Sequence, residues 1–540
     1  MRYRFATNPS LPKLSWVAEV DQTVETVSIH HGPFVEVRDR FFIEGVWNGD
    51  FEQGDFGTTD CVFGTGAILG DRSVLFVSSA STTDYLYYHR TDKRVVVSNS
   101  LPLLLSHIDD SLDPHFKGYP GINYSIAEGI DDYIREIPTL KGSVKRLMYR
   151  NLEVSSARVA EVEKDMPPRF HSFEAYYSYL LENYRHIVNN ARDPNRKITL
   201  QIFSTQSKGY DSTAVNAIAA KLGIDKVFTS SKGKNNKYLA TNDAAKQVDD
   251  DGSEICKALG VDCNVIDRRS FVREFEQEDL YYAGLHANQD ANLKDINDHI
   301  DTATILLTGT LGEIWYTTDC AKGHSQPIDA ALRRWDLGGH GLAEIRLVVG
   351  FIHLPMPFIG ARQRQDILRI TESVEMKPWR LENAYDRPIP RRIAEQAGVP
   401  RHLFGQVKTG SVVIFPEPSI PQGERLRREF FDYLVREKIV GRQTIKFWRL
   451  VHFVNTILSL RSETRYRAVY YFERIISKLT NREFRFTPLW QHLNGSLFCF
   501  SVNKRVHVYE SCFREEGCIM RYPDFPLNDR VNLTAHKMPE

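Results

Sequence analysis

The chain has 540 residues, in which 69 Lys and Arg balance 69 Asp and Glu, so the formal net charge is zero. This length predicts two or three domains, and the balanced charge argues against a general attraction to nucleic acid or membrane surfaces. We find no apolar run long enough to span a bilayer, and the first residues lack the apolar segment of a secretory signal. Seven cysteines without a C-x-x-C pair indicate free thiols in a reducing cytoplasm. We therefore expect a cytoplasmic protein, and the sequence leaves its oligomeric state open.

Residues 1–165 are rich in short β-like runs that Gly, Asp and Asn turns separate. The predicted strands cover Val27–Ile29, Phe41–Val46, Ser73–Val77, Tyr85–Tyr88 and Val95–Ser98. Two prolines in the run Asp165–Pro168 predict a boundary, and an amphipathic helix is expected from about His171 to Asn190. The sequence thus indicates a β-rich N-terminal domain, a linker and a long helix.

The stretch from residue 198 to residue 223 predicts a strand, a short polar loop and a helix. Ile198, Leu200 and Ile202 alternate as in a strand. Apolar residues then recur at helical spacing, and Gly223 stands where a C-terminal cap belongs.

The loop between this strand and this helix reads Ser207-Lys208-Gly209-Tyr210-Asp211-Ser212. A loop at this place presents backbone N–H groups and the positive end of a helix dipole, which favour an anion. Two serine hydroxyls and one ammonium group add donors, so a phosphate is the expected guest. The alternative is an ordinary strand-to-helix turn capped by Asp211 or Ser212.

Strands and helices alternate from residue 198 to about residue 310, which indicates a parallel sheet with helices on its faces. The further strands are expected at Lys226–Thr229, Cys263–Asp267 and Thr304–Thr308, and the helices before Gly260 and over about Phe271–His286. In such sheets ligands bind at the carboxyl ends of the strands. The Ser207–Ser212 loop and Gly309–Glu313 both fall there, so we expect them to face one pocket.

Residues 420–485 carry many Arg and Lys among aromatic side chains and are predicted to be helical. Because these charges are spread over amphipathic helices of a neutral chain, a solvated helical face is favoured over a contact with RNA or peptide. The alternation of Phe498, Phe500 and Val502 predicts a β-like extension over residues 481–540.

Several motifs resemble, in order, those of the asparagine synthetase family and its relatives, the β-lactam synthetases and lasso-peptide cyclases. The Ser207–Ser212 loop is similar to the family's Ser-Gly-Gly-x-Asp-Ser pyrophosphate loop, with Lys208 in place of the first glycine. Ile305–Glu313 resembles the second motif, and Tyr385–Arg392 and Phe404–Gly410 resemble the C-terminal motifs.

The resemblance implies an α/β fold with two main domains. Residues 1–165 would form a degenerate glutaminase-like αββα domain of the class II amidotransferase type. Residues 170–480 would form the parallel-sheet ATP-pyrophosphatase (adenine nucleotide α-hydrolase-like) synthetase domain, before the extension at residues 481–540.

The resemblance also implies ATP and Mg²⁺ as cofactors. The residues that would bind the pyrophosphate portion of ATP are Ser207, Lys208, Gly209, Asp211 and Ser212. Asp211 and Glu313 would carry Mg²⁺, which often takes only one or two carboxylates from protein. Glu313 stands where the family usually has Asp, and Ile314 where it usually has a further acidic residue. Lys408 matches the family's catalytic lysine, and its alternative is a solvated loop lysine.

The N-terminal domain resembles a glutaminase domain through Asp84–Tyr88 followed by Val95–Leu101. The family's glutaminase uses a cysteine at position 2 as a thiolate nucleophile. This chain has Arg2 there, and its first cysteine is Cys61. We expect a domain that is retained structurally and is catalytically inactive, so that glutamine is not the nitrogen donor.

A stretch around Ala343–Arg346 matches the region where relatives place a helix lining the acceptor pocket. Glu344 is therefore a second candidate catalytic residue, as a base or an amine-binding group. His340 and His353 flank this stretch, and we expect them to be packed or surface histidines rather than catalysts.

Together these features predict an ATP-dependent, AMP-forming carbon–nitrogen ligase that joins a small-molecule or peptide carboxylate to an amine without glutamine hydrolysis. One alternative is an inactive nucleotide-binding or scaffolding descendant of the same fold, because Lys208, Thr310 and Ile314 depart from the family pattern. A third reading is the same ATP chemistry acting on RNA. The sequence identifies neither the carboxylate nor the amine.

Overall fold

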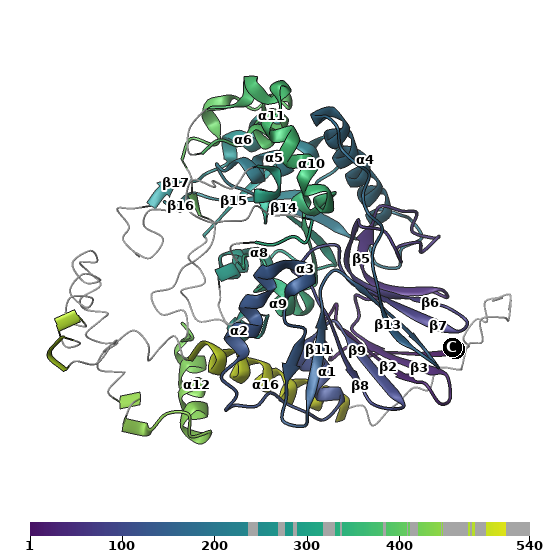
Figure 1. Ribbon diagram of the computed structural model, residues 1–540. Coiled ribbons are helices and arrows are strands. Elements are labelled where there is room, and N and C mark those ends of the chain that lie inside the picture. The colour runs from purple at the N-terminus through teal and green to yellow at the C-terminus, as the bar shows by residue number, and fades with distance from the viewer. Residues whose placement is uncertain are drawn as a thin grey trace, which may run out of the picture.

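The computed structural model shows a mixed α/β protein with several sheets (Figure 1). The residues that it describes are 1–235, 247–267, 276–284, 289–316, 330–334, 337–381, 385–407, 409–410, 420–443, 445–446, 474–475, 478–480 and 493–514. In this part of the chain no helix is both long enough and apolar enough to cross a membrane.

Two sheets form the N-terminal part of the chain. The seven-stranded sheet has the order β1-β3-β2-β9-β8-β11-β10 and the six-stranded sheet the order β13-β12-β7-β6-β5-β4, and only β1 and β3 pair in parallel. The strands are β1 (Arg2–Thr7), β2 (Trp16–Asp21), β3 (Thr26–His31), β4 (Glu36–Val37), β5 (Phe41–Trp47), β6 (Val62–Leu69), β7 (Ser73–Val77), β8 (Leu86–Arg90), β9 (Arg94–Ser98), β10 (Glu136–Pro138), β11 (Ser143–Leu147), β12 (Asn151–Ser155) and β13 (Val159–Val162). The strands expected in this region are all confirmed.

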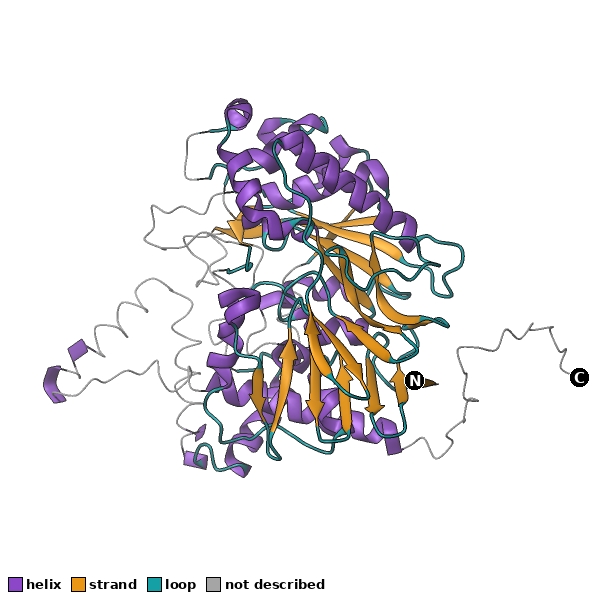
Figure 2. Ribbon diagram, turned by 45° about the vertical axis from the view of Figure 1, so that its right-hand side comes forward, coloured by secondary structure: helices purple, strands orange, loops and turns teal. Residues whose placement is uncertain are grey.

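The two N-terminal sheets enclose an apolar core between them (Figure 2). Trp16 and Phe76 belong to different sheets, and their rings stack with centroids 5.9 Å apart. Alternating side chains of each strand turn into this core, as the period of two requires. Helix α1 (Leu101–His107) packs on the seven-stranded sheet, and helix α4 (Phe173–Ala191) packs on β5 of the other sheet.

The parallel sheet has five strands in the order β18-β15-β14-β19-β20, and all its neighbouring pairs are parallel. The strands are β14 (Gln201–Gln206), β15 (Lys226–Ser230), β18 (Cys263–Ile266), β19 (Thr304–Thr308) and β20 (Phe351–Pro355). The predicted parallel sheet is thereby confirmed. The order reverses direction between β14 and β19, and a crevice at such a switch point is where open α/β sheets bind ligands.

Helices cover both faces of the parallel sheet (Figure 1). Ile202 packs in a cluster with residues of α4 and α5 (Tyr210–Leu222), whereas its neighbour Phe203 packs with residues of α7 (Glu278–Gly284) and α9 (Leu342–Val349). The other α-helices in the described part of the chain are α2 (Tyr119–Tyr124), α3 (Gly129–Asp132), α6 (Ser253–Leu259), α8 (Lys294–Asn297), α10 (Arg364–Glu372), α11 (Pro388–Gln396), α12 (Glu424–Arg436) and α16 (Leu493–Arg514). A small sheet has the order β17-β16-β21, from β16 (Lys232–Asn235), β17 (Gln247–Asp249) and β21 (Thr409–Gly410).

The prediction of a β-like extension over residues 481–540 is wrong for residues 493–514, which form helix α16. Phe498 and Val502 are one helical turn apart and pack in one apolar cluster, whereas Phe500 packs in another. A helix that is buried on several sides has apolar residues two apart as well as four apart, so its sequence shows the same alternation as a strand.

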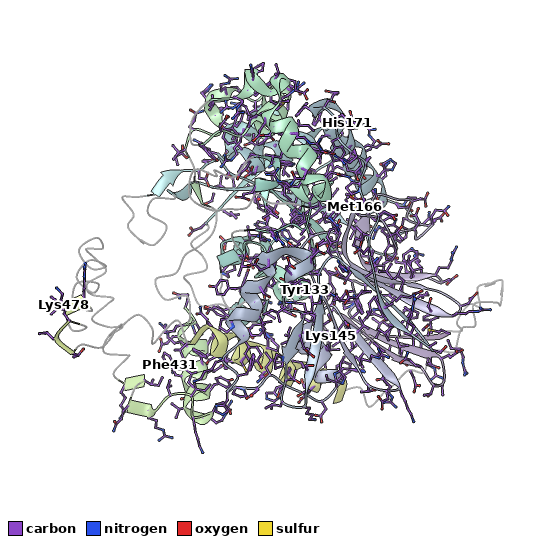
Figure 3. The ribbon with its side chains drawn as sticks, in the orientation of Figure 1. Tyr133, Lys145, Met166, His171, Phe431 and Lys478 are labelled. Atoms are coloured by element: carbon purple, nitrogen blue, oxygen red, sulfur yellow. The ribbon has the colours of Figure 1, made fainter. Side chains whose placement is uncertain are left out.

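An irregular segment joins the two halves of the chain, between β13 and α4. Figure 3 labels Met166 and His171 on this segment. The predicted boundary at residues 165–170 falls here, and the domain limits themselves stay a prediction. One apolar cluster nevertheless includes residues of both halves, among them Phe41 and Ile202.

Candidate functional site

The Ser207–Ser212 loop leaves the carboxyl end of β14 and enters α5. Its polar residues are partly exposed, whereas Tyr210 within it is buried. The two serine hydroxyls lie 2.8 Å apart, and the Ser207 hydroxyl accepts a hydrogen bond from the Gly209 N–H at 3.1 Å. These bonds fold the loop into a compact turn at the switch point of the sheet.

The start of α5 differs from a capped turn. Its N-terminal cap is Gly209, which makes no side-chain capping bond, and Asp211 lies inside the first turn. The Ser212 hydroxyl accepts a hydrogen bond from the Ser207 N–H at 3.1 Å and so serves the loop. The alternative in which Asp211 or Ser212 caps this helix is therefore wrong.

Two consecutive aspartates contact Lys208. The Lys208 ammonium forms an ion pair with Asp249, the last residue of β17. The Lys208 backbone N–H donates to the Asp250 carboxylate at 2.9 Å, and Asp250 is 1% exposed. Carboxylates thus contact both the side chain and the backbone of Lys208, and the side chain is turned toward β17.

The turn after β19 packs directly against Asp211. A Cβ on Gly309 would lie 2.8 Å from the Asp211 Cβ, and a Cβ on Gly312 would lie 2.5 Å from both oxygens of the Asp211 carboxylate. Only glycine fits at these two positions. Leu311 between them has φ 59°, an uncommon backbone conformation that the tight packing holds in place. The structure therefore joins the two loops that were expected to face one pocket.

The two carboxylates predicted to hold a metal, Asp211 and Glu313, both act electrostatically on Tyr316. Burial raises the pKa of the Tyr316 hydroxyl well above its usual value, and the charges of Glu313 and Asp211 raise this pKa further. Among the described residues, no group of three or more His, Cys, Asp or Glu side chains is placed to hold a metal ion. Two carboxylates are still a fitting donor set for Mg²⁺, which completes its shell with water and phosphate oxygens. Ile314, next to Glu313, is buried in the core.

Two later segments pack on the same loop. Tyr385 packs on the Tyr210 ring with centroids 4.8 Å apart, and the Arg391 guanidinium donates to the Tyr210 hydroxyl. The Gly405 N–H donates to the Lys208 carbonyl oxygen at 2.8 Å, and Gly405 belongs to the segment Phe404–Gly410, which is expected to carry a catalytic lysine. That lysine, Lys408, lies outside the described residues.

Sequence reasoning gave no role to two arginines at this site. The Arg387 guanidinium lies 3.4 Å from the centroid of the Tyr316 ring, and Arg364 donates to the Glu313 carbonyl oxygen at 3.2 Å. Arg364 is fully buried, and it holds the short helix that carries Glu313. Arg387 belongs to the segment Tyr385–Arg392, which was singled out by its motif. Nothing in the sequence marks Arg364.

Glu344 lies away from this loop, between α9 and the start of α1. It is 1% exposed, and its carboxylate accepts hydrogen bonds from the Ser100 hydroxyl at 2.7 Å and from the Leu101 N–H at 3.0 Å. Both carboxylate oxygens are thus bonded to the N-terminal end of α1. A catalytic role for Glu344 stays a prediction. Its hydrogen bonds to Ser100 and Leu101 connect the two halves of the chain.

Replacing Glu344 by Gln is expected to change how stability depends on pH. Burial raises the pKa of Glu344 from 4.5 to about 7. Because its pKa is raised, the buried Glu344 carboxyl contributes its full stability below pH 4.5, and this contribution is lost as the pH rises toward 7. The free energy of unfolding of the wild type, relative to Glu344→Gln, should therefore fall by about 1–3 kcal/mol across this range.

Urea unfolding across this pH range measures that difference. The exposed Glu174→Gln is the control, because it makes the same chemical change on the surface of α4. A difference between wild type and Glu344→Gln that stays constant from acid to neutral pH would contradict the raised pKa.

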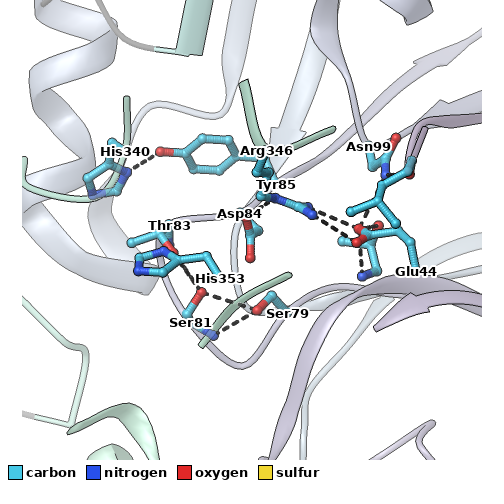
Figure 4. A network of polar contacts seen from close by, with 12 residues as sticks. Glu44, Ser79, Ser81, Thr83, Asp84, Tyr85, Asn99, His340, Arg346 and His353 are labelled. Atoms are coloured by element: carbon cyan, nitrogen blue, oxygen red, sulfur yellow. Dashed lines mark hydrogen bonds and ion pairs between the residues drawn. The ribbon is translucent and has the colours of Figure 1, made fainter. Parts of the chain in front are cut away.

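His340 and His353 are fully buried, which confirms that they are packed histidines. Burial lowers the pKa of His340 well below its usual value and the pKa of His353 to about 3, so both rings are neutral. The His340 Nδ1 is hydrogen-bonded to the Tyr85 hydroxyl, and its Nε2 lies 2.9 Å from the Arg334 guanidinium. Both histidines therefore belong to a buried polar network between the two halves of the chain (Figure 4).

The charged centre of this network is Arg346. Its guanidinium contacts the two oxygens of Glu44 at 2.8 and 2.9 Å and the Asp84 carboxylate at 2.6 Å. All three side chains are at most 1% exposed. The Glu44 carboxylate also accepts hydrogen bonds from Thr65 of β6 and from Asn99, which follows β9. The ion pairs thus fix the parallel sheet's helix α9 to the N-terminal part.

No protein-family model matches this chain, and no curated protein matches it. What the site does chemically is therefore inferred from its residues and their arrangement.

Proposed function

We propose that the protein is an ATP-dependent, AMP-forming amide ligase of the asparagine synthetase type. The observation that carries this proposal is the meeting of four distant segments at the carboxyl edge of the parallel sheet. These segments are 207–212, 309–313, 385–391 and 404–405. Each resembles a family motif, and together they surround one partly exposed loop at a helix N-terminus, where a polyphosphate is bound most readily.

In the proposed reaction, a carboxylate oxygen attacks the α-phosphorus of ATP. The bond to the bridging oxygen breaks, and pyrophosphate leaves with an acyl-adenylate remaining. An amine then attacks the acyl carbon, so that a carbon–nitrogen bond forms, AMP leaves and the nitrogen loses a proton. The carboxylate and the amine are small molecules or peptides.

The loop residues supply the electrostatics of this site. The Ser207 and Ser212 hydroxyls and the backbone around Gly209 would bind the pyrophosphate portion. Asp211 and Glu313 would hold Mg²⁺, which neutralises phosphate charge when bound. The Arg387 guanidinium, which lies over the Tyr316 ring, would add a fixed cation for the leaving group. Lys408 keeps its proposed role on the motif alone.

The N-terminal half is proposed to be a glutaminase-like fold that does not hydrolyse glutamine. Arg2 begins β1 with an exposed side chain, and a guanidinium is not a nucleophile. Cys61 is fully buried, and burial raises the pKa of its thiol well above the usual value, so this thiol is inert. The amine would therefore come from a bound substrate. We also propose a cytoplasmic location, since the five cysteines in the described chain are free thiols.

A pyrophosphate-release assay across amino acids and short peptides as carboxylates tests the proposal. The expected result is release that needs ATP, Mg²⁺ and one class of carboxylate. Nucleotide binding without any formation of AMP would refute the ligase function.

The second candidate is a nucleotide-binding protein without catalysis. It is favoured by one observation: hydrogen bonds from the Lys208 and Gly209 N–H groups already go to Asp250 and Ser207. An ATP phosphate would have to replace these acceptors. An enzyme acting on RNA predicts binding that weakens steeply with salt, and the zero net charge gives it no support.

Lys208→Gly is expected to weaken ATP binding by up to about fivefold. The Lys208 side chain neutralises Asp249 beside the proposed phosphate site, and a partly exposed ion pair is worth about 0–1 kcal/mol. Without it, Asp249 repels the polyphosphate. ATP titration followed by calorimetry measures the affinity.

The double variant Lys208→Gly/Asp249→Asn is the matched test, because it removes both charges. We expect it to recover most of the lost affinity. Tighter ATP binding by Lys208→Gly alone would mean that the lysine side chain blocks the loop.

A further inference from the structure

A chain of hydroxyl groups links the N-terminal half to the turn after β19. Within the segment between β7 and β8, Ser79 lies 3.1 Å from Ser81, and Ser81 lies 2.9 Å from Thr83. The Thr83 hydroxyl lies 3.2 Å from the Nδ1 of His353 on β20. These residues are fully buried, and Figure 4 shows them near the Arg346 ion pairs.

The chain continues from His353 into the proposed ligase site. The His353 Nε2 lies 2.8 Å from the hydroxyl of Thr308, the last residue of β19. The Thr308 hydroxyl donates to the Thr310 hydroxyl at 2.9 Å. Thr310 is partly exposed, and it follows Gly309, which packs on Asp211. The chain therefore begins in the N-terminal half and ends at the phosphate side of the sheet.

The hydrogen bonds have one consistent direction. Because the Thr308 proton goes to Thr310, the hydrogen bond to Thr308 comes from the Nε2–H of His353. The ring is neutral, so its Nδ1 carries no proton and accepts from Thr83. Thr83 thereby fixes the tautomer of His353, and Thr310 keeps its own proton for a ligand.

Gly339 covers this junction. With φ +86°, a Cβ there would lie 2.9 Å from the Thr83 Cγ2, 3.0 Å from the Thr310 Cγ2 and 3.3 Å from the His353 Cε1. Thr83 and Thr310 therefore pack under one residue, although they are distant in the sequence.

We propose that Thr83 is a positioning residue of the ligase site: through His353 and Thr308 it orients the Thr310 hydroxyl as a hydrogen-bond donor at the reacting end. This inference rests on the proposed function. It also gives the N-terminal half a role in that function that needs no glutaminase chemistry, because Ser79, Ser81 and Thr83 lie in that half.

The test compares Thr83→Val with Thr82→Val. Both replace a buried threonine by a residue of the same shape, and the Thr82 hydroxyl has no hydrogen-bond partner among the described residues. We expect Thr83→Val to lower kcat for hydroxamate formation from ATP and carboxylate by about tenfold, with KM for ATP within about twofold. Thr82→Val should match the wild type, and Thr83→Ser, which keeps the hydroxyl, should restore kcat. Equal losses in both valine variants, or none in either, would overturn the proposal.

A second readout does not depend on activity. The ¹⁵N signals of His353, assigned by their loss in His353→Gln, report its tautomer and its bonds. In Thr83→Val, the signal of the unprotonated ring nitrogen should shift toward that of a nitrogen without a donor, and in Thr82→Val it should not. If the wild type forms no AMP, the proposed function fails. An unchanged His353 signal in Thr83→Val would then separately refute the positioning by Thr83.

Discussion

Asp211→Asn should reduce AMP formation on the order of a hundredfold or more, while the protein stays folded. Asn has the shape of Asp, so it keeps the close packing against Gly309 and Gly312. It removes the negative charge that is proposed to hold Mg²⁺ beside Glu313. The Mg²⁺-dependent part of ATP binding should be lost with it, since an amide is a weaker ligand for this hard cation.

The measurement is a Mg²⁺ titration of pyrophosphate release and of ATP binding, with thermal unfolding as a check on the fold. Asp262→Asn is the control, because Asp262 is an exposed carboxylate before β18 in the same sheet. Asp211→Asn activity within a few-fold of this control would show that the carboxylate is only structural.

Arg346→Ala should lower the free energy of unfolding by about 3–5 kcal/mol, the largest stability effect that we expect for a single substitution. The variant leaves the Glu44 and Asp84 carboxylates buried and without their cation. Burial already raises the pKa of Asp84 with the arginine in place. Without the arginine, a buried carboxylate has to take up a proton or draw in water. Because protonation is easier at acid pH, the loss of unfolding free energy should be smaller there.

Urea unfolding of Arg346→Ala and of Arg425→Ala measures this difference. Arg425 pairs with Glu429 on the surface of α12 and is 73% exposed, so its loss should cost about 0–1 kcal/mol. Adding Glu44→Gln and Asp84→Asn to Arg346→Ala should recover part of the stability. No recovery would mean that lost packing, not the two unpaired charges, explains the effect.

Local signals allowed the sequence to predict much of this site. A strand, the loop at residues 207–212 and α5 follow from side-chain periodicity and from Gly223 within one short stretch. The strand itself covers Gln201–Gln206, so Ile198 and Leu200 of the predicted alternation precede it. The alternation of strands and helices then placed Gly309–Glu313 at the same edge of the sheet. The structure adds that Gly312 touches the Asp211 carboxylate, a contact between residues that no local pattern relates.

Other features depend on tertiary packing and had no local signal. Asp249 and Asp250 reach Lys208 from a different strand and the turn after it, and the buried guanidinium of Arg364 resembles any surface arginine in the sequence. Helix α16 was misread as strand because its apolar residues face two clusters. Glu344 was placed near the chemistry by motif position, whereas its partners Ser100 and Leu101 come from the other half of the chain.

Trapping with hydroxylamine tests the central proposal most directly, because it needs no knowledge of the natural amine. The protein is incubated with ATP, Mg²⁺, hydroxylamine and pools of amino acids and short peptides, and the nucleotide and acyl products are identified. The proposed mechanism predicts AMP, pyrophosphate and a hydroxamate in equal amounts, and on the order of a hundredfold less of each with Asp211→Asn. ATP that binds at the loop and stays intact, or that yields ADP and phosphate, would contradict it.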